Sequence, residues 1–276
     1  MASRQVAVVT GSNKGIGLAI VRALCKQFTG DVYLTSRDPK LGEAAVKELQ
    51  GEGLTAFFHQ LDITDLQSIR RLRDFLKQKY GGIDVLINNA GIAFKDADPT
   101  PFDVQADVTL KTNFFATRDV CNELLPVMKP HGRVVNISSW IGSKTLALCS
   151  EDLQQKFHSD TVTEEELVTL MEKFVQDAKD GVHSKEGWPN TAYGVSKLGV
   201  TVLSKVQART LNEKRKGEGI LLNACCPGWV MTDMAGPSAL KTPDEGAETP
   251  VYLALLPLDA DGPHGQLVKD KKVEKW

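Results

Sequence analysis

A strand, a glycine-punctuated turn and a helix open the chain, and this unit constrains the fold more than any other stretch. An apolar run over residues 6–9 leads into Gly11, Gly15 and Gly17, and apolar side chains at helical spacing follow at once. Glycine permits a tight turn and lets a ligand approach bare backbone. Backbone N–H groups and the positive end of the helix dipole then point at one place, where a pyrophosphate is stabilised. Chance could space three of the 23 glycines this way, but their position between a strand and a helix favours a dinucleotide site.

Apolar strands alternate with helical patterns along the rest of the chain. Predicted strands cover residues 31–36, 55–60, 83–91, 133–138 and 220–226, and predicted helices cover residues 39–50, 66–80, 103–128, 193–213 and 243–256, before a short terminal strand. This order predicts a doubly wound parallel sheet, a Rossmann-like three-layer α/β/α fold. The chain has 276 residues, 42% of them hydrophobic, and no Ser/Pro-rich linker, so we expect a single domain over residues 1–276. Asn113 interrupts one helical pattern and predicts a local bend.

The junction after the second strand predicts the cofactor. In dinucleotide units that bind NAD, a carboxylate about 20 residues beyond the glycines accepts hydrogen bonds from the ribose. Here Arg37 occupies that junction, and Lys14 lies in the glycine turn. A guanidinium and an ammonium suit the 2′-phosphate of NADP. Asp38 is the alternative ribose ligand, but we interpret it as the N-cap of the helix that begins at Pro39.

Polar side chains gather where the predicted strands end. Ligands of parallel sheets bind beyond the carboxyl ends of the strands, where Gly11, Asp62, Asn89 and Ser139 fall. Asp62 could accept a hydrogen bond from the adenine amino group or cap a helix, and both interpretations stay open. The amides of Asn88 and Asn89 can join neighbouring loops as well as face a cofactor.

Tyr193 and Lys197 stand four residues apart at the start of a predicted helix, so their side chains are neighbours on one face. Such a pair is most often an aromatic ring packed on a lysine stem. The combination of motifs changes this interpretation. Thr10-Gly-x3-Gly-x-Gly, Asn88-Asn-Ala-Gly91, Asn113, Ser139 and Tyr193-x3-Lys197 occur in this order across almost the whole chain.

This set resembles the short-chain dehydrogenase/reductase family. Within it, the residues at 13–14, 111–115 and 223–229 are similar to those of the monomeric NADPH-dependent carbonyl reductases. The resemblance implies a catalytic tetrad of Asn113, Ser139, Tyr193 and Lys197. Ser138 could serve on chemistry alone, but the strand-end position favours Ser139.

The resemblance also implies a role for each tetrad residue. A carbonyl that accepts hydride develops negative charge on its oxygen, so Ser139 and Tyr193 would donate hydrogen bonds to it, and Tyr193 would give up its proton. A free phenol has a pKa of about 10, and we expect the Lys197 ammonium to lower the pKa of Tyr193. Lys197 would also bind the nicotinamide ribose, and the backbone carbonyl of Asn113 would hold a water. The residues assigned to NADP are Gly11, Asn13, Lys14, Gly15, Ile16, Gly17, Arg37, Asp62, Ile63, Asn89, Gly91, Tyr193, Lys197, Pro227, Gly228, Val230 and Thr232.

The predicted substrate pocket is apolar and adaptable. Trp229, Met231, Met234 and Phe94 suit bulky apolar or aromatic carbonyls, although core packing is an equal alternative for each. The resemblance implies quinones, aromatic ketones and aldehydes, and keto-prostaglandins or keto-steroids as substrates. A polar part of a substrate, such as a glutathione conjugate, could meet two of the predicted contacts, the side chains at positions 95 and 105. The full set of predicted substrate contacts is Phe94, Lys95, Gln105, Ser139, Ile141, Tyr193, Trp229 and Met234.

The sequence departs from the family between Ser139 and Tyr193, where residues 140–190 form a predicted helical insertion. Residues 163–179 carry an apolar stripe at helical spacing, which includes Leu167 and Phe174. Most members of the family form dimers and tetramers through the neighbouring helices. We therefore expect a monomer in which the insertion supplies the apolar cover.

Composition limits the other possibilities. The net charge of −2, from 33 basic and 35 acidic residues, favours small-molecule partners over nucleic acid or a membrane surface. Five cysteines without a disulfide pattern and no signal peptide predict a cytoplasmic protein, and the scattered histidines predict no metal site. Cys225 and Cys226 are predicted to point to opposite faces of their strand, so at most one of them lies near the pocket. We expect this to be Cys226, either as a thiol exposed to reactive substrates or, as is more common, as an inert buried one.

Two alternatives to a reductase stay open. The chain could act oxidatively as an NADP-dependent hydroxysteroid or prostaglandin dehydrogenase, although cells keep NADP mostly reduced. It could also be a non-catalytic dinucleotide sensor, which would need the glycine turn but not Tyr193 and Lys197 together.

Overall fold

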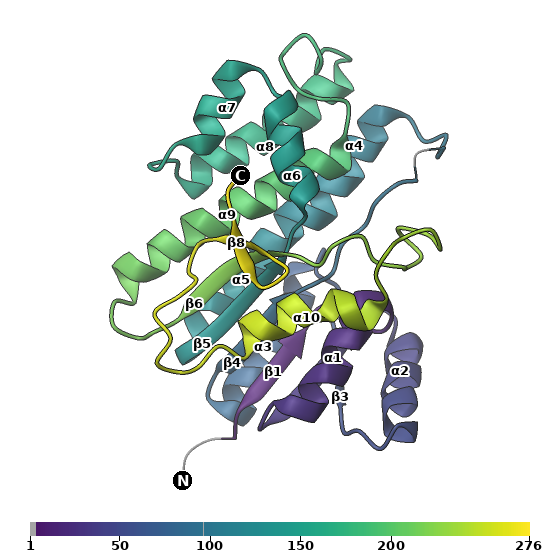
Figure 1. Ribbon diagram of the computed structural model, residues 1–276, viewed down its shortest axis with the longest axis vertical. Coiled ribbons are helices and arrows are strands. Elements are labelled where there is room, and N and C mark those ends of the chain that lie inside the picture. Colours follow the sequence, from purple (N-terminus) through teal and green to yellow (C-terminus); the bar gives the residue numbers. More distant parts are fainter. Residues whose placement is uncertain (1–3, 96) are drawn as a thin grey trace.

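The computed structural model describes residues 4–95 and 97–276, and a twisted sheet runs through its centre (Figure 1). The strands are β1 (Val6–Val9), β2 (Asp31–Ser36), β3 (Phe57–Gln60), β4 (Ile83–Asn88), β5 (Met128–Ile137), β6 (Leu221–Cys226), β7 (Leu267–Lys269) and β8 (Lys272–Glu274). Their order is β3-β2-β1-β4-β5-β6-β7-β8, and every pair is parallel except β7 with β8. The strand order reverses between β1 and β4, which is where ligands of such sheets bind.

Helices cover both faces of the sheet and confirm the predicted three-layer fold. On one face lie α1 (Gly15–Gln27), α2 (Pro39–Gly51) and α10 (Pro243–Ala254), whose Leu24, Leu49 and Val251 share one apolar core. On the other face lie α3 (Leu66–Tyr80), α5 (Thr117–Leu124) and the second half of α9 (Ala192–Lys214), with Leu72 and Leu211 in a second core. Within the described residues, no helix is both long enough and apolar enough to cross a bilayer.

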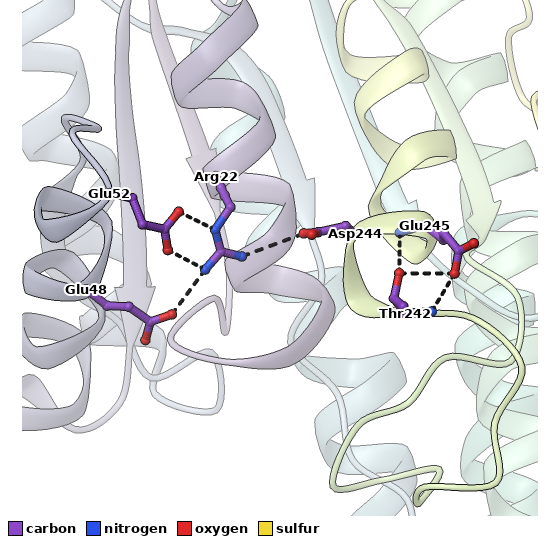
Figure 2. A network of polar contacts seen from close by, with 6 residues as sticks. All are labelled: Arg22, Glu48, Glu52, Thr242, Asp244 and Glu245. Carbon is purple, nitrogen blue, oxygen red and sulfur yellow. Dashed lines mark hydrogen bonds and ion pairs between the residues drawn. The ribbon is translucent and has the colours of Figure 1, made fainter.

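An arginine joins the three helices of the first face (Figure 2). Arg22 on α1 donates from Nε to Glu52 Oε2 at 2.7 Å and from Nη2 to Glu48 Oε1 at 3.1 Å. Its Nη1 lies 3.7 Å from Asp244 Oδ1 on α10, a helix whose first turn is capped by the side chain of Thr242. Arg22 therefore links α1 to the C-terminal end of α2 and to the first turn of α10.

The predicted helix over residues 103–128 is divided. It consists of α4 (Phe102–Leu110), a π-helix over Lys111–Ala116, α5 and a short 3-10 turn over Leu125–Val127. The wide turn at Asn113 is the predicted bend. The next strand was predicted from Arg133, but β5 begins at Met128. Its first residues lack an apolar run and include Pro130, and His131 has a φ of 62°, so the sequence there does not resemble a strand. The predicted terminal strand is a pair, β7 and β8.

The segment between β5 and α9 folds into α6 (Trp140–Leu148), α7 (Glu151–His158) and α8 (Glu164–Lys179), which gather at the upper end of the molecule in Figure 1. The stripe of α8 is buried against α4 and α9 in a third apolar core. At Gly199 on α9, an added Cβ would lie 2.7 Å from Met171 Sδ and 2.8 Å from Phe114 Cδ2. Insertion, π-helix and α9 therefore meet without space between them. After α8, Trp188 Nε1 donates to the buried Asp177 Oδ2 at 2.9 Å.

Candidate active site

The glycine turn has the backbone geometry that the sequence predicted. Gly11 and Gly15 have φ values of 57° and 58°, a region that side chains disfavour. A Cβ on Gly11 would lie 2.8 Å from Ala90 Cα, and one on Gly17 would lie 2.5 Å from Asn89 Nδ2. Because nothing larger than hydrogen fits at these positions, the turn lies directly against the end of β4.

Asparagines at the end of β4 hold this edge together. Asn89 Nδ2 donates to the carbonyl oxygens of Thr10 at 3.1 Å and Gly11 at 2.9 Å, so it links the ends of β1 and β4. Asn88 Nδ2 donates to Asn136 Oδ1 at 2.8 Å and links β4 with β5. Both amides thus join neighbouring segments, which is the structural role that the sequence suggested for them beside cofactor binding.

The side chain of Asn113 is fixed by the segment that follows β4. Its Oδ1 accepts from Ile92 N at 2.8 Å, and its Nδ2 donates to Ile92 O at 2.9 Å and to Ser196 Oγ at 3.0 Å. An added Cβ on Gly91 would lie 3.2 Å from Asn113 Oδ1 and 3.7 Å from Lys197 Nζ. Asn113 and Lys197 therefore converge on Gly91, from the π-helix and from α9.

Tyr193 and Lys197 meet at the start of α9. Lys197 Nζ lies 5.6 Å from the centroid of the Tyr193 ring and donates to Ile137 O at the end of β5, at 2.8 Å. The Ser139 hydroxyl lies close enough to the phenol to lower its pKa. Ser138, by contrast, is buried and donates to Lys197 O at 2.9 Å. Of the two serines, only Ser139 is beside the phenol.

Burial governs the protonation of this pair. It raises the pKa of Tyr193 to about 12, with a further increase from the neighbouring Cys226 and a decrease from the Ser139 hydroxyl. Burial lowers the pKa of Lys197 to about 8. In the polypeptide alone the pKa of Tyr193 is therefore raised rather than lowered, because burial disfavours the phenolate. At neutral pH the phenol is protonated and can donate its proton.

The loop between β6 and α10 lies across from the glycine turn. An added Cβ on Gly15 would lie 3.3 Å from Thr232 Cγ2, and Lys14 Nζ donates to Asp233 Oδ2 at 2.7 Å. The loop is held from the other side by Lys241, whose carbonyl accepts from Met231 N at 2.8 Å. The other predicted cofactor residues of this loop are Pro227, Gly228 and Val230, between β6 and this contact.

The residues predicted to select NADP fit a phosphate. Arg37 is exposed directly after β2, and within the described residues no carboxylate lies within 4.0 Å of its guanidinium, which leaves the fork of donors free. Asp38 Oδ1 accepts from Lys40 N at 2.8 Å and caps α2, as interpreted from the sequence. Asp62 Oδ1 accepts from Thr64 N at 2.9 Å, so it caps a turn, while Asp65 is the N-cap of α3.

Two more predicted cofactor positions have buried or half-buried side chains. Ile63 belongs to the core between the sheet and α3, and Ile16 packs on the core beneath α1. For Ile63 the backbone is therefore the part available to a ligand, whereas the side chain of Ile16 stays partly exposed. Asn13 is half-buried in the turn itself.

Four apolar side chains that the sequence predicts near the tetrad, here called the exposed rim, are open to solvent. Trp229 is 51% exposed, and Met231, Met234 and Ile141 are also exposed, so core packing is excluded for these four side chains. Phe94 is half-buried and Lys95 is exposed in the segment after β4. Gln105 on α4 was predicted to contact a polar part of the substrate. Its side-chain Nε2 instead donates to the carbonyl oxygen of Thr100 at 2.8 Å.

Comparison with known proteins assigns the chain to a family. The sequence model of the family described as short chain dehydrogenase matches residues 5–151. The chain belongs to this short-chain dehydrogenase family. It is 71% identical over 271 residues to carbonyl reductase (NADPH) 1 of Homo sapiens, with 98% of each chain covered, and 68% identical over 272 residues to carbonyl reductase (NADPH) 3 of Rattus norvegicus, with 99% of this chain and 98% of the other covered.

Solved structures show the same fold. Salutaridine reductase from Papaver somniferum aligns with a TM-score of 0.85 and 32% identity, over 97% of this chain and 100% of the other. Menthone neomenthol reductase from Mentha piperita aligns with a TM-score of 0.80 and 28% identity, over 98% of this chain and 100% of the other.

This short-chain dehydrogenase has features of the site that its sequence did not reveal. Trp140, directly after Ser139, is 38% exposed, and the ammonium groups of Lys144 and Lys269 lie over its ring. The aromatic residue directly after the predicted serine was the sequence signal that could have pointed to this cluster.

Cys225 and Cys226 are both buried and belong to different cores, and of the two only Cys226 affects the pKa values of Tyr193 and Lys197. Among the described residues, no group of three or more His, Cys, Asp and Glu side chains has the geometry of a metal site.

Proposed function

We propose that this short-chain dehydrogenase is an NADPH-dependent carbonyl reductase that converts ketones, aldehydes and quinones to alcohols. The carrying observation is the convergence of Ser139, Tyr193 and Lys197 at the carboxyl edge of the sheet, opposite the glycine turn. Full-length relatives at 71% identity bear the name carbonyl reductase (NADPH) 1, which supports the same activity here.

The proposed cofactor site is made of the glycine turn and two cations. The turn offers backbone N–H groups to the pyrophosphate, and Arg37 and Lys14 would bind the 2′-phosphate. Bound NADPH supplies the hydride. Lys197, whose Nζ already donates to Ile137 O, has further donors for the ribose hydroxyls.

Tyr193 acts as the proton donor in this proposal. A pKa of about 12 keeps the phenol neutral until a more basic oxyanion forms beside it, and the Ser139 hydroxyl stabilises the same oxyanion. Asn113 has its side chain fully engaged, so its role would come from the backbone carbonyl in the π-helix, which can hold a water that resupplies protons. An oxidative dehydrogenase would need the phenolate as a base, and the raised pKa opposes this at neutral pH. A sensor without chemistry would not need these three side chains together.

The substrate class follows from the exposed rim of Trp229, Met231, Met234 and Ile141. Indole and thioether surfaces adapt to quinones, aromatic ketones and aldehydes, and keto-prostaglandins or keto-steroids. A glutathione adduct would meet Lys95, which is exposed near this rim. We further propose a cytoplasmic monomer, a single domain over residues 1–276 in which the 140–190 insertion covers α4 and α9.

Oxidation of NADPH, followed by its absorbance, tests the activity with menadione, an aromatic aldehyde and a hydroxysteroid in parallel, each with NADPH and with NADH. We expect reduction of the quinone and the aldehyde, with NADPH preferred. Tyr193→Phe should bind NADPH as tightly as the parent protein and lose about 10²- to 10⁴-fold in kcat. Near-full turnover by Tyr193→Phe would remove Tyr193 as the acid, and absence of NADPH oxidation with every carbonyl would contradict the reductase.

A further inference from the structure

Two lysines share one exposed indole next to the tetrad. Lys144 Nζ lies 4.3 Å from the ring of Trp140, and Lys269 Nζ lies 5.2 Å from the same ring. Trp140 and Lys144 are one turn apart on α6, whereas Lys269 comes from the end of β7. Elements far apart in the sequence therefore bring two positive charges to one aromatic surface.

This cluster lies at the edge of the sheet where the proposed reaction occurs. Trp140 is the residue after Ser139, and α6 begins where β5 ends (Figure 1). Lys269 is paired in register with Cys226, which lies close enough to Tyr193 and Lys197 to affect the pKa values of both. The indole and the two ammonium groups are therefore at the same edge of the sheet as Ser139.

Neither ammonium forms a close ion pair within the part of the chain that the structure describes. Within residues 4–95 and 97–276, no carboxylate lies within 4.0 Å of Lys144 Nζ or Lys269 Nζ. The acid that follows Lys269, Asp270, accepts from Lys241 Nζ at 2.6 Å and is engaged there. A cation over an aromatic face keeps N–H donors that point away from the ring. Two unpaired ammonium groups beside one flat apolar surface suit a ligand with an anionic end and an aromatic or aliphatic body.

We propose that Trp140, Lys144 and Lys269 form a subsite for the carboxylate of an anionic carbonyl substrate. The body of the substrate packs on the indole and the lysines bind the carboxylate, while the carbonyl group lies at Ser139 and Tyr193. The subsite rests on the proposed reductase function and names the substrates it favours: keto acids and aldehyde acids with a flexible or aromatic spacer.

The test compares each acid with its methyl ester, which keeps the body and removes the charge. Suitable probes are 4-(4-formylphenyl)butanoate and 4-formylcinnamate with their esters. The ratio of kcat/KM for acid over ester should be above one in the parent protein, and it should fall by about 1.4- to 5-fold for Lys144→Met and again for Lys269→Met, the range measured for exposed ion pairs. Added salt should lower the ratio in the parent protein and leave the double variant unchanged. Lys77→Met, an exposed lysine on α3, is the matched control and should keep the parent ratio.

Calorimetry gives a readout without turnover. With NADPH-loaded protein, 4-phenylbutanoate should bind more tightly than 4-phenylbutanamide, and the double variant should lose this difference. An acid-to-ester ratio that stays at the parent value in the double variant, while the ester is reduced normally, overturns the subsite and leaves the reductase intact. Failure to reduce either ester contradicts the reductase, and equal binding of the two phenyl compounds then overturns the subsite independently.

Discussion

The contact between Lys14 and Asp233 leads to the prediction that an acidic residue weakens cofactor binding. Lys14 Nζ lies 2.7 Å from Asp233 Oδ2. The hydrogen bond and the charge of Lys14 hold the pKa of Asp233 below its ordinary value, so the carboxylate is charged at neutral pH. If Lys14 binds the 2′-phosphate as proposed, that phosphate must compete with Asp233 for the same ammonium. Asp233→Asn removes the competing charge and is expected to tighten NADPH binding.

The exposure of the pair sets the size of this effect. The side chains of Lys14 and Asp233 are 69% and 82% exposed, so water screens their attraction strongly. Exposed ion pairs of this kind change equilibrium constants by about 1.4- to 5-fold, and we expect the Kd of NADPH to fall within that range. NADH carries no 2′-phosphate, so its Kd should change by less. High salt should reduce the difference, because the interaction is screened over about 10 Å at 0.1 M.

Fluorescence titration with NADPH and NADH, at low and at high salt, measures these constants. Asp152→Asn is the matched control, since Asp152 also has an exposed lysine partner, Lys156, but lies on α7 in the insertion. An unchanged Kd for NADPH would refute the competition. A weaker NADPH complex would refute it too, and would mean that the loop with Asp233 closes over the bound cofactor.

The remaining predictions concern protonation, folding and assembly. The reductive kcat/KM should be constant up to neutral pH and fall as pH rises through about 8, where Lys197 loses its proton. Tyr193, with a pKa of about 12, stays protonated over this range. A profile that is flat to pH 10 would contradict this assignment. Trp188→Phe removes the Nε1 donor to the buried Asp177 carboxylate, and urea unfolding should show a free energy of unfolding lower by about 1.5–3 kcal/mol. A loss well under that range would show that the Lys173 ammonium alone satisfies the carboxylate. Sedimentation should give a mass near 30.2 kDa, and a mass of twice that value would contradict the monomer.

Much of this fold was predictable because its signals are local. The strand, turn and helix from Val6 to Gln27 follow from apolar periodicity and from glycines that the backbone needs at positive φ. The start of β5 was not predictable, since its first residues are mostly polar and include Pro130 and Gly132, which are not typical of a central strand.

The candidate site was also only partly predictable from the sequence. The spacing of Tyr193 and Lys197 made them neighbours from the sequence alone. Their pKa values could not be derived from spacing, because these depend on burial by segments far away in the chain. Trp140 was also missed as a platform, since Lys269 reaches it only through the order of strands in the sheet.

The contact at Gly199 has a consequence for protein engineering. There the insertion, the π-helix with Asn113 and the helix with Tyr193 touch through one glycine. A chimera that exchanges residues 140–190 with those of a homologous enzyme would transplant part of the support of the reacting groups, and so would shift turnover even when every side chain that touches the ligand is retained.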